Sequence, residues 1–438
     1  MKFETVLKQT PNRFTKYLHG SLFVNAYALI LSNILVAVAS YVFWIIVARK
    51  YGPGITGTAS GILSAMAVLN TITSFGLEVG LLRYIPSLPN PHHKASLITF
   101  SSAVRTAASV FAAVVFLAGI RVWSPGLIDN LNEGPEIWLF IFLVLTNGIY
   151  QLFNAVFVAH RTSQFVTLTS AVYNGLKLLF LLLIPVIFGF KGVIFTVVAS
   201  IFITILYAGY RIQQTYRGYD FRFLQSGLIK EFLIYSSSNQ LVDVFLGLPQ
   251  MLLPLFVINS LGAEANGIFY IAWMISSIVR TFSVSIAQST FAESSSQAEN
   301  FGKNLWQGLK LSILVTVSCA ALLAVFAPWL LSFFGKSYVS GGLVILQWFL
   351  VSVIPFSFVI LYITAQRVRK NIPYLLLVTG AWFGVSVIAS LIGLKANGLE
   401  GLTTGWVLSQ FISLALCVVL FFIENFLLTK RIKLFKWK

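Results

Sequence analysis

Charged residues are scarce in this sequence. They make up 10% of its 438 positions, against roughly 25% in an ordinary soluble domain. Hydrophobic residues make up 58%. A soluble protein needs more charge to cover its surface, and a disordered chain has the opposite composition. The composition therefore excludes both classes and favours a membrane protein with many spanning segments.

Cysteine and histidine are also rare. The two cysteines, Cys319 and Cys417, lie in apolar runs, which excludes a disulfide framework. Of the four histidines, His92 and His93 lie in a polar loop with no third ligand nearby, so we expect no metal site. No phosphate-binding P-loop and no catalytic triad pattern occurs. We therefore expect no bound cofactor and no enzymatic activity.

Long apolar runs dominate what is present. A spanning helix takes about 20 mostly apolar residues, whereas a membrane β-barrel shows short alternating segments. The runs here are long and do not alternate, so they predict an all-α polytopic membrane protein with about 12 transmembrane helices. The predicted spans are residues 20–47, 55–79, 96–120, 136–159, 165–188, 191–210, 231–259, 267–290, 306–333, 342–365, 372–394 and 401–427.

A polar, basic stretch at 211–230 lies between the sixth and seventh spans. It predicts a cytoplasmic linker between an N-terminal six-helix lobe at 1–210 and a C-terminal six-helix lobe at 231–429, followed by a basic tail at 430–438. Lys and Arg outnumber Asp and Glu by 30 to 13 and concentrate in the tails and in alternate loops. Under the positive-inside rule, this distribution places both termini in the cytoplasm. The excess charge then orients the chain in a cell membrane, and we expect no nucleic-acid partner.

The two halves of the sequence repeat at an offset of 210 or 209 residues. Gly52 falls on Gly262, and the turn GFKGV at 189–193 falls on GLEGL at 398–402. Six spans return the chain to the same side of the membrane, so both repeats have the same orientation. A two-lobed helical protein of this kind predicts a transporter whose substrate site lies between the lobes near the bilayer midplane.

Polar residues recur at helical spacing on one face of several predicted spans. Arg105, Lys177, Asp243 and Arg280 lie inside spans, where a charge is costly unless it faces a cavity or a partner. The excess of cations favours an anionic ligand such as phosphate, and the hydroxyls and amides suit a sugar. The other interpretation is polar contact between packed helices. The candidate cavity residues are Arg105, Lys177, Arg280, Asp243, Asn174, Asn147, Gln151, Asn239 and Arg49.

Residues 44–86 resemble the polysaccharide-transporter branch of the multidrug/oligosaccharidyl-lipid/polysaccharide (MOP) exporter superfamily. The stretch contains the patterns ARxxGPxxxGxxS and GLxxGxxRxxP. The resemblance implies two lobes in a V shape, as in multidrug and toxin extrusion (MATE) transporters, with a cationic central cavity. It also implies a flippase that moves polyprenyl-(pyro)phosphate-linked oligosaccharide from the cytoplasmic to the outer leaflet. Such proteins serve the biosynthesis of surface polysaccharide or lipopolysaccharide, including O-antigen.

The same resemblance implies partners and an alternative. The partners are the lipid-linked oligosaccharide, membrane lipids, a glycan polymerase and glycosyltransferases. The alternative is a cation-coupled multidrug antiporter, which commonly holds a carboxylate in its first lobe. Here Glu78 is the first-lobe acid within a span and lies near a membrane face, and Asp243 is the central acid of the second lobe. The sequence does not decide whether H⁺ or Na⁺ is coupled to transport.

Overall fold

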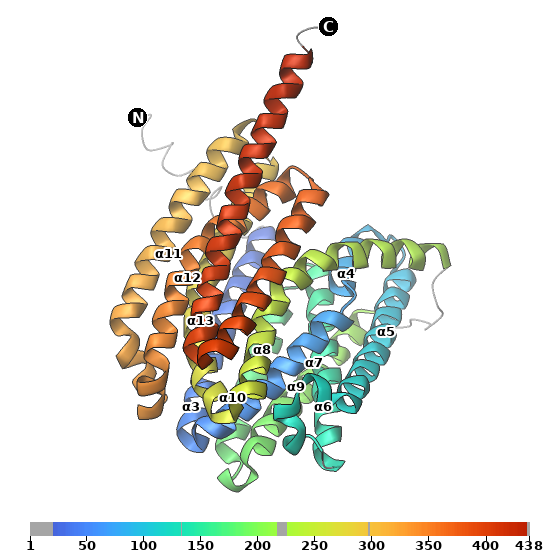
Figure 1. Cartoon of the computed structure of the whole chain (residues 1–438). Coiled ribbons are helices and arrows are strands. Elements are labelled where there is room, and N and C mark those ends of the chain that lie inside the picture. The colour runs from blue at the N-terminus through green and yellow to red at the C-terminus, as the bar shows by residue number, and fades with distance from the viewer. Residues whose placement is uncertain (1–20, 133, 217–225, 297, 436–438) are drawn as a thin grey trace, which may run out of the picture. The chain divides into compact units, whose positions relative to one another are not determined.

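The computed structural model describes residues 21–132, 134–216, 226–296 and 298–435. Within these ranges the chain is helical and has no strand (Figure 1), which confirms the all-α prediction. Within these ranges, side chains are described for all residues except 21–34, 226–228, 238–239, 296, 298 and 425–435.

Nine helices in the described part of the chain are long and apolar enough to cross a membrane. Six of these helices each match one predicted span. They are α5 (Pro91–Ala118), α7 (Gly134–Ala159), α8 (Gln164–Leu183), α9 (Gly189–Thr215), α11 (Phe301–Ser332) and α12 (Lys336–Val368).

The three remaining long helices each cover most or all of two predicted spans, although the span predicted at 55–79 continues past the end of α3. They are α3 (Ser21–Thr73), α10 (Ser226–Ser296) and α13 (Ile372–Phe435), and each includes residues with non-helical torsion angles. The prediction of about twelve spans is therefore consistent with the fold, and the chain is a multi-pass membrane protein. Short helices occupy several connections: α4 (Leu77–Ser87), α6 (Ile120–Trp123), η1 (Pro125–Asn130), η2 (Val186–Phe188) and η3 (Ala298–Asn300).

The interruptions occur at glycines that are paired in the sequence repeat. Gly52 in α3 has φ 76° and ψ 178°, and Gly262 in α10 has φ 86° and ψ −179°. Gly189 at the start of α9 has φ 53° and ψ −137°, and Gly398 in α13 has φ 55° and ψ −136°. Residues with a side chain rarely adopt positive φ. Glycine at these places lets the chain leave one helix and begin the next.

A further repeated feature involves residues that are not glycine. Arg161, which follows α7, has φ 59°, and Lys370, which follows α12, has φ 56°. In each case the next amide donates back to the preceding helix, to the carbonyl of Phe157 at 2.9 Å and of Gln366 at 3.0 Å. This is the hydrogen-bond pattern of a Schellman helix end. The matched torsion angles and hydrogen bonds support the internal repeat.

The chain forms two compact units. Of the described residues, the first unit contains those up to Lys50 and those within Met66–Gln240, and the second contains Tyr51–Ala65 and those from Leu241 onward. The predicted lobe boundaries near residues 210 and 231 both fall inside the first unit, and the division into lobes stays a prediction. Residues 217–225 of the predicted linker and 436–438 of the basic tail lie outside the described residues.

In the first unit, α4 packs against α5 and α7, and α9 packs against α7 and α8. Leu77, Leu81, Leu97 and Leu152 are fully buried in the core beside α4. The side chain of Lys50 donates to the carbonyls of Leu181 and Ile184 at 2.9 and 2.6 Å, at the end of α8. These carbonyls lack partners within the helix, so Lys50 caps α8.

In the second unit, α12 packs against both α11 and α13 (Figure 1). Its core contains the rings of Trp273, Phe349 and Trp406, which meet edge to face. The short stretch from α3 that belongs to this unit approaches α10 closely. A Cβ added at Gly57 would overlap the backbone of Ala263, so only glycine fits there.

Candidate substrate-binding site

Three basic side chains are buried within the described part of the chain. Arg105 is 0% exposed, and Lys177 and Arg280 are each 5% exposed. All three lie inside predicted spans and were candidate cavity residues. A buried charge needs a compensating partner, so the surroundings of each cation decide its role.

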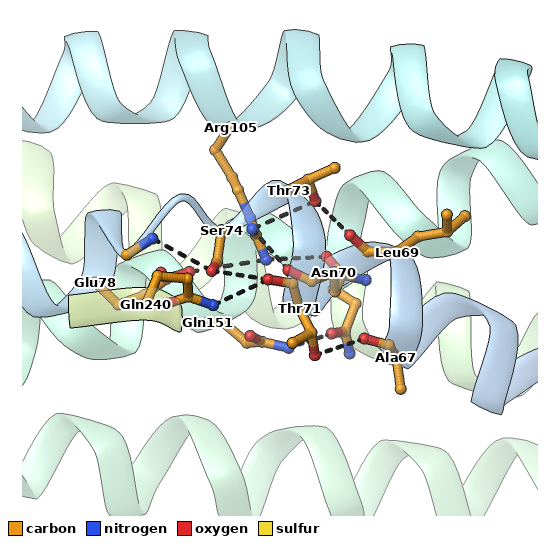
Figure 2. Close-up of polar contacts among 12 residues, drawn as sticks. Ala67, Leu69, Asn70, Thr71, Thr73, Ser74, Glu78, Arg105, Gln151 and Gln240 are labelled. Carbon is orange, nitrogen blue, oxygen red and sulfur yellow. Dashed lines mark hydrogen bonds and ion pairs between the residues drawn. The ribbon is translucent and has the colours of Figure 1, made fainter. Parts of the chain in front are cut away.

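Arg105, on α5, is surrounded by polar partners of the first unit (Figure 2). Its guanidinium donates to the backbone carbonyl of Asn70 at 2.9 Å, to Oδ1 of Asn70 at 3.1 Å and to Oγ1 of Thr73 at 3.4 Å. It also lies 3.7 Å from a carboxylate oxygen of Glu78 on α4. These groups pair with both terminal nitrogens of the guanidinium, whereas its Nε is buried without a partner among the described residues.

The Arg105 contacts lie where α3 ends and α4 begins. Phe75 and Gly76 between these helices have φ 45° and 69°. The last carbonyls of a helix have no partner within it. Arg105 donates a hydrogen bond to the carbonyl of Asn70, and Nε2 of Gln240 donates at 3.0 Å to the carbonyl of Thr71 (Figure 2). Arg105 therefore contacts both sides of the break between α3 and α4, and its contact with a ligand stays a prediction.

Lys177, on α8, has aromatic neighbours. Its Nζ lies 4.7 Å from the ring centre of Phe43 and 4.9 Å from that of Tyr173. Among the described residues, no carboxylate or hydrogen-bond acceptor pairs with it. Cation–π contacts contribute about 0.5–2 kcal/mol each, which is less than the cost of burying a charge. The Lys177 charge is therefore undercompensated within the described residues.

Three polar candidate residues of the first unit have different surroundings. One turn from Lys177, Asn174 is buried, and its Nδ2 donates to the carbonyl of Ser170 at 2.9 Å. Its Oδ1 is buried without a partner among the described residues. On α7, Nε2 of Gln151 donates to Oδ1 of Asn147 at 2.6 Å, and Gln151 is exposed. Asn174 thus offers a free acceptor, while Asn147 and Gln151 are hydrogen-bonded to each other.

Arg280, on α10, lies in an aromatic cage of the second unit. Its Cζ is 4.3 Å from the ring centre of Phe356, 5.4 Å from that of Trp273 and 5.5 Å from that of Trp406. No described carboxylate or carbonyl pairs with its guanidinium. In the same cage, Nε1 of Trp406 is a buried donor without a partner among the described residues. The cage thus contains a positive charge and hydrogen-bond donors. Among the described residues, no carboxylate compensates the charge and no acceptor pairs with the donors.

Asp243, the central acid of the second lobe, does not compensate Arg280. Its Oδ1 lies 3.1 Å from Nη2 of Arg367 on α12, and both side chains are exposed. The pair lines a cavity of about 350 Å³ together with Gln250 and Gln288. Among the described residues, the charge partner of Asp243 is therefore Arg367, a residue far along the sequence, and not one of the three cations inside the predicted spans.

The other acids of the described part follow one rule. Each buried or half-buried carboxylate has a basic partner, and the remaining acids are exposed. Lys177 and Arg280 are thus buried cations without an acid, whereas no described buried acid lacks a cation. The buried or half-buried pairs are Glu78 with Arg105 at 3.7 Å, Glu136 with Lys191, and Glu424 with Arg369 at 2.9 Å.

Two predicted site residues give less information. Arg49 is exposed and lies next to the helix-capping Lys50 in the first unit. Asn239 lies on α10, and its side chain is outside the described residues. Sequence reasoning missed Arg367 as the partner of Asp243. It also missed the rings of Phe43, Phe356 and Trp406 around the cations. Aromatic residues occur throughout the apolar spans, so these three have no distinguishing pattern in the sequence.

No protein-family model matches the sequence, and no curated protein matches it. Solved structures nevertheless share the fold. An inward-facing multidrug resistance MATE family transporter of the MOP superfamily is 15% identical with a TM-score of 0.71, covering 89% of this chain and 95% of that one. Lipid II flippase MurJ, in an inward closed conformation, is 12% identical with a TM-score of 0.73, covering 92% of this chain and 89% of that one.

An outward-facing MATE family transporter is also similar, at 15% identity and a TM-score of 0.63. These likenesses confirm the predicted MATE-like helical fold along nearly the whole chain. Because the sequence identities are only 12–15%, these structures show a similar fold and nothing more specific. The polysaccharide-transporter branch stays a prediction.

Proposed function

We propose that the protein is a flippase for polyprenyl-(pyro)phosphate-linked oligosaccharide. In this proposal it acts in a cell membrane, with both termini in the cytoplasm, and supplies surface polysaccharide or lipopolysaccharide synthesis. Lys177 and Arg280 are each proposed as a phosphate-binding residue of its own unit. A glycan polymerase and glycosyltransferases are its proposed functional partners.

The observation that carries the proposal is the absence of a carboxylate beside these two cations among the described residues. Lys177 lies against two rings and Arg280 against three. A charge buried in this way has lost its favourable solvation by water. Contacts with aromatic rings offset only part of that free-energy cost. Phosphate is the natural complement of both guanidinium and ammonium groups. The likeness to a lipid II flippase supports a lipid-linked cargo.

One observation favours the alternative, a cation-coupled multidrug antiporter. The exposed carboxylate of Asp243 lines a cavity of about 350 Å³ with two glutamines, a set of groups that suits an organic cation. The likeness to MATE family transporters agrees with it. Arg367, at 3.1 Å from Asp243, offsets that negative charge. The charge balance of the described residues therefore favours the anionic cargo.

The proposal is tested in cells that lack the gene and are complemented with variants. Lipids are extracted, and polyprenyl-phosphate-linked sugars are quantified by mass spectrometry together with the surface glycan. We expect the deletion to accumulate one complete lipid-linked oligosaccharide and to lose the matching glycan. Lys177→Met and Arg280→Met keep the volume and remove the charge, so they should fail to complement while still inserting into the membrane.

Lys336→Met, at an exposed site, is the matched control and should complement fully. Unchanged lipid-linked pools and unchanged glycan in the deletion strain would contradict the flippase. In that case the accumulation of fluorescent organic cations is measured, and a rise in the deletion strain that Asp243→Asn fails to reverse would establish the antiporter.

A further inference from the structure

A second cavity lies in the second unit, formed by α11, α12 and the C-terminal part of α13. Its volume is about 560 Å³, and its lining is mostly apolar, including Leu305, Leu361 and Phe421. Pockets of this size, between about 300 and 1,000 Å³, are typical ligand sites. We call it the α11–α13 groove. It shares no lining residue with the cavity that contains Asp243.

One end of the α11–α13 groove is polar and contains Arg369. Nη1 of Arg369 donates at 2.9 Å to Oε2 of Glu424, and its Cζ lies 5.2 Å from the ring centre of Phe301. The other carboxylate oxygen of Glu424 accepts from Tyr362 at 3.2 Å and Gln366 at 2.7 Å. Glu424 is therefore well satisfied, while Arg369, with five N–H donors and a side chain 36% exposed, keeps donors for a ligand.

Further positive charge adjoins this end in the sequence. Lys303 follows the groove residue Gly302, and Lys370 follows Arg369, and both lysines are exposed. Against them stand the exposed Glu299 and the buried Glu424, which is already paired. Among the described residues, the basic residues at or next to this end in the sequence therefore outnumber the acidic ones by three to two, and the rest of the lining is mostly apolar.

The ends of helices that meet here share one predicted side of the membrane. They are the start of α11, the end of α12 and the end of the last predicted span, all of which the distribution of Lys and Arg places at the cytoplasmic face. Trp306 lines the groove, is 57% exposed and lies 5.1 Å from Nζ of Lys310. Exposed tryptophan and lysine are typical of the membrane interface. Anionic lipids are concentrated in the cytoplasmic leaflet, and basic pockets between spanning helices bind their head groups.

We propose that the α11–α13 groove binds an anionic glycerophospholipid of the cytoplasmic leaflet. One acyl chain lies between α11 and α13, and the phosphate contacts Arg369 and Lys303. The inference does not depend on the transported cargo, since it concerns residues that the proposed substrate site does not use.

The experiment measures lipid retention by the full-length protein. The purified protein is exchanged with equimolar phosphatidylglycerol and phosphatidylcholine in detergent, and bound lipid is counted by native mass spectrometry. We expect one phosphatidylglycerol to be retained in preference to phosphatidylcholine. Lys303→Gln should weaken its apparent affinity about fivefold, as expected for one interfacial cation.

Gly302→Leu is the sharper variant, because a Cβ at Gly302 meets no atom within 4 Å and the longer side chain enters the groove without disturbing the helix. It should abolish retention. Gly175→Leu, on an exposed helical site of the first unit with equal open space, is its matched control and should retain the lipid. Both lysine and glycine variants leave the Arg369–Glu424 pair intact, so they should fold normally.

Equal retention of the two phospholipids would overturn the proposal, as would undiminished phosphatidylglycerol binding in Gly302→Leu. Displacement of the phospholipid by an equal concentration of polyprenyl phosphate would also overturn it and assign the groove to the cargo. Lys177→Met should lose transport and still retain phosphatidylglycerol normally. The lipid proposal and the flippase proposal can therefore fail independently of each other.

Discussion

At the scale of single residues, different side chains fill equivalent positions in the two repeats. In the first unit Arg105 fills the space beside Gly148, where an added Cβ would lie 2.8 Å from the arginine Nε. Near the repeat-related place in the second unit, three buried hydroxyls meet: Ser283 lies 2.9 Å from both Thr316 and Ser357. Ser357 corresponds to Gly148 at an offset of 209 in the sequence. Small hydroxyls fill the space without a charge, whereas the arginine needs Glu78 and a glycine.

The first unit should therefore depend on the Arg105 charge for stability. Arg105→Gln leaves Glu78 and the carbonyl of Asn70 without their partner. Removing one member of a buried pair costs about 3–5 kcal/mol, and we expect the lower end because Glu78 is 20% exposed. Thermal unfolding of the purified protein in detergent should show a large drop in Tm, which the double variant with Glu78→Gln partly restores.

Gly148→Ala gives an independent check on the same contact, because its methyl group would press on Arg105 and on Asn70 at 2.9 Å. It should also lower Tm. Gly175→Ala, where an added Cβ meets nothing within 4 Å, is the control and should not. A wild-type Tm in both Arg105→Gln and Gly148→Ala would show that Arg105 is free for another role.

At the scale of secondary-structure elements, glycines with positive φ determine where the long helices are interrupted. Gly52 and Gly262 share nearly the same torsion angles, and so do Gly189 and Gly398. A chain can pass from one span to the next in so few residues only where a residue tolerates φ near 50–90°, and glycine does so at least cost. The repeat is therefore preserved in backbone conformation even though few side chains match.

Gly52→Ala should destabilise the protein by about 1–3 kcal/mol, the usual cost of a residue held in a sparsely populated backbone region. Gly54→Ala, two residues later, is the matched control: it has ordinary torsion angles and open space for a Cβ, so it should be neutral or slightly stabilising. Folded yield and Tm measure both. Equal behaviour of the two variants would mean that the Gly52 conformation is not required.

At the scale of the whole molecule, the distribution of charge predicts the orientation in the membrane. Lys303 and Lys370 lie in connections that the positive-inside rule places in the cytoplasm, and Lys336 and Lys395 lie in connections placed outside. All four are exposed. The two natural cysteines lie in helices, where Cys417 is buried and Cys319 half-buried. The chain therefore suits a cysteine-labelling experiment in intact cells.

In a background with Cys319→Ala and Cys417→Ala, we expect Lys336→Cys and Lys395→Cys to react with a membrane-impermeant maleimide added outside. Lys303→Cys and Lys370→Cys should react only after the cells are permeabilised. The reverse pattern would invert the topology and place the α11–α13 groove in the outer leaflet. Labelling of all four from outside would contradict a fixed orientation.

The sequence by itself determined the features that depend on composition and local pattern. Long apolar runs predicted the spanning helices, because a bilayer requires every backbone polar group to be satisfied within a helix. Paired glycines predicted the turns, because positive φ needs glycine. The rarity of charge inside spans also marked Arg105, Lys177 and Arg280, and these are the basic side chains that are buried in the described part of the chain.

Only the tertiary structure decided which of these cations have a partner. Glu78 and Asn70 reach Arg105 because α5 packs beside the break between α3 and α4, and Asp243 reaches Arg367 across 124 positions of sequence. Lys177 and Arg280 lie instead against aromatic rings. Charges in a low-dielectric interior interact over a few ångströms, so their pairing follows from helix packing, which spacing along the chain does not encode.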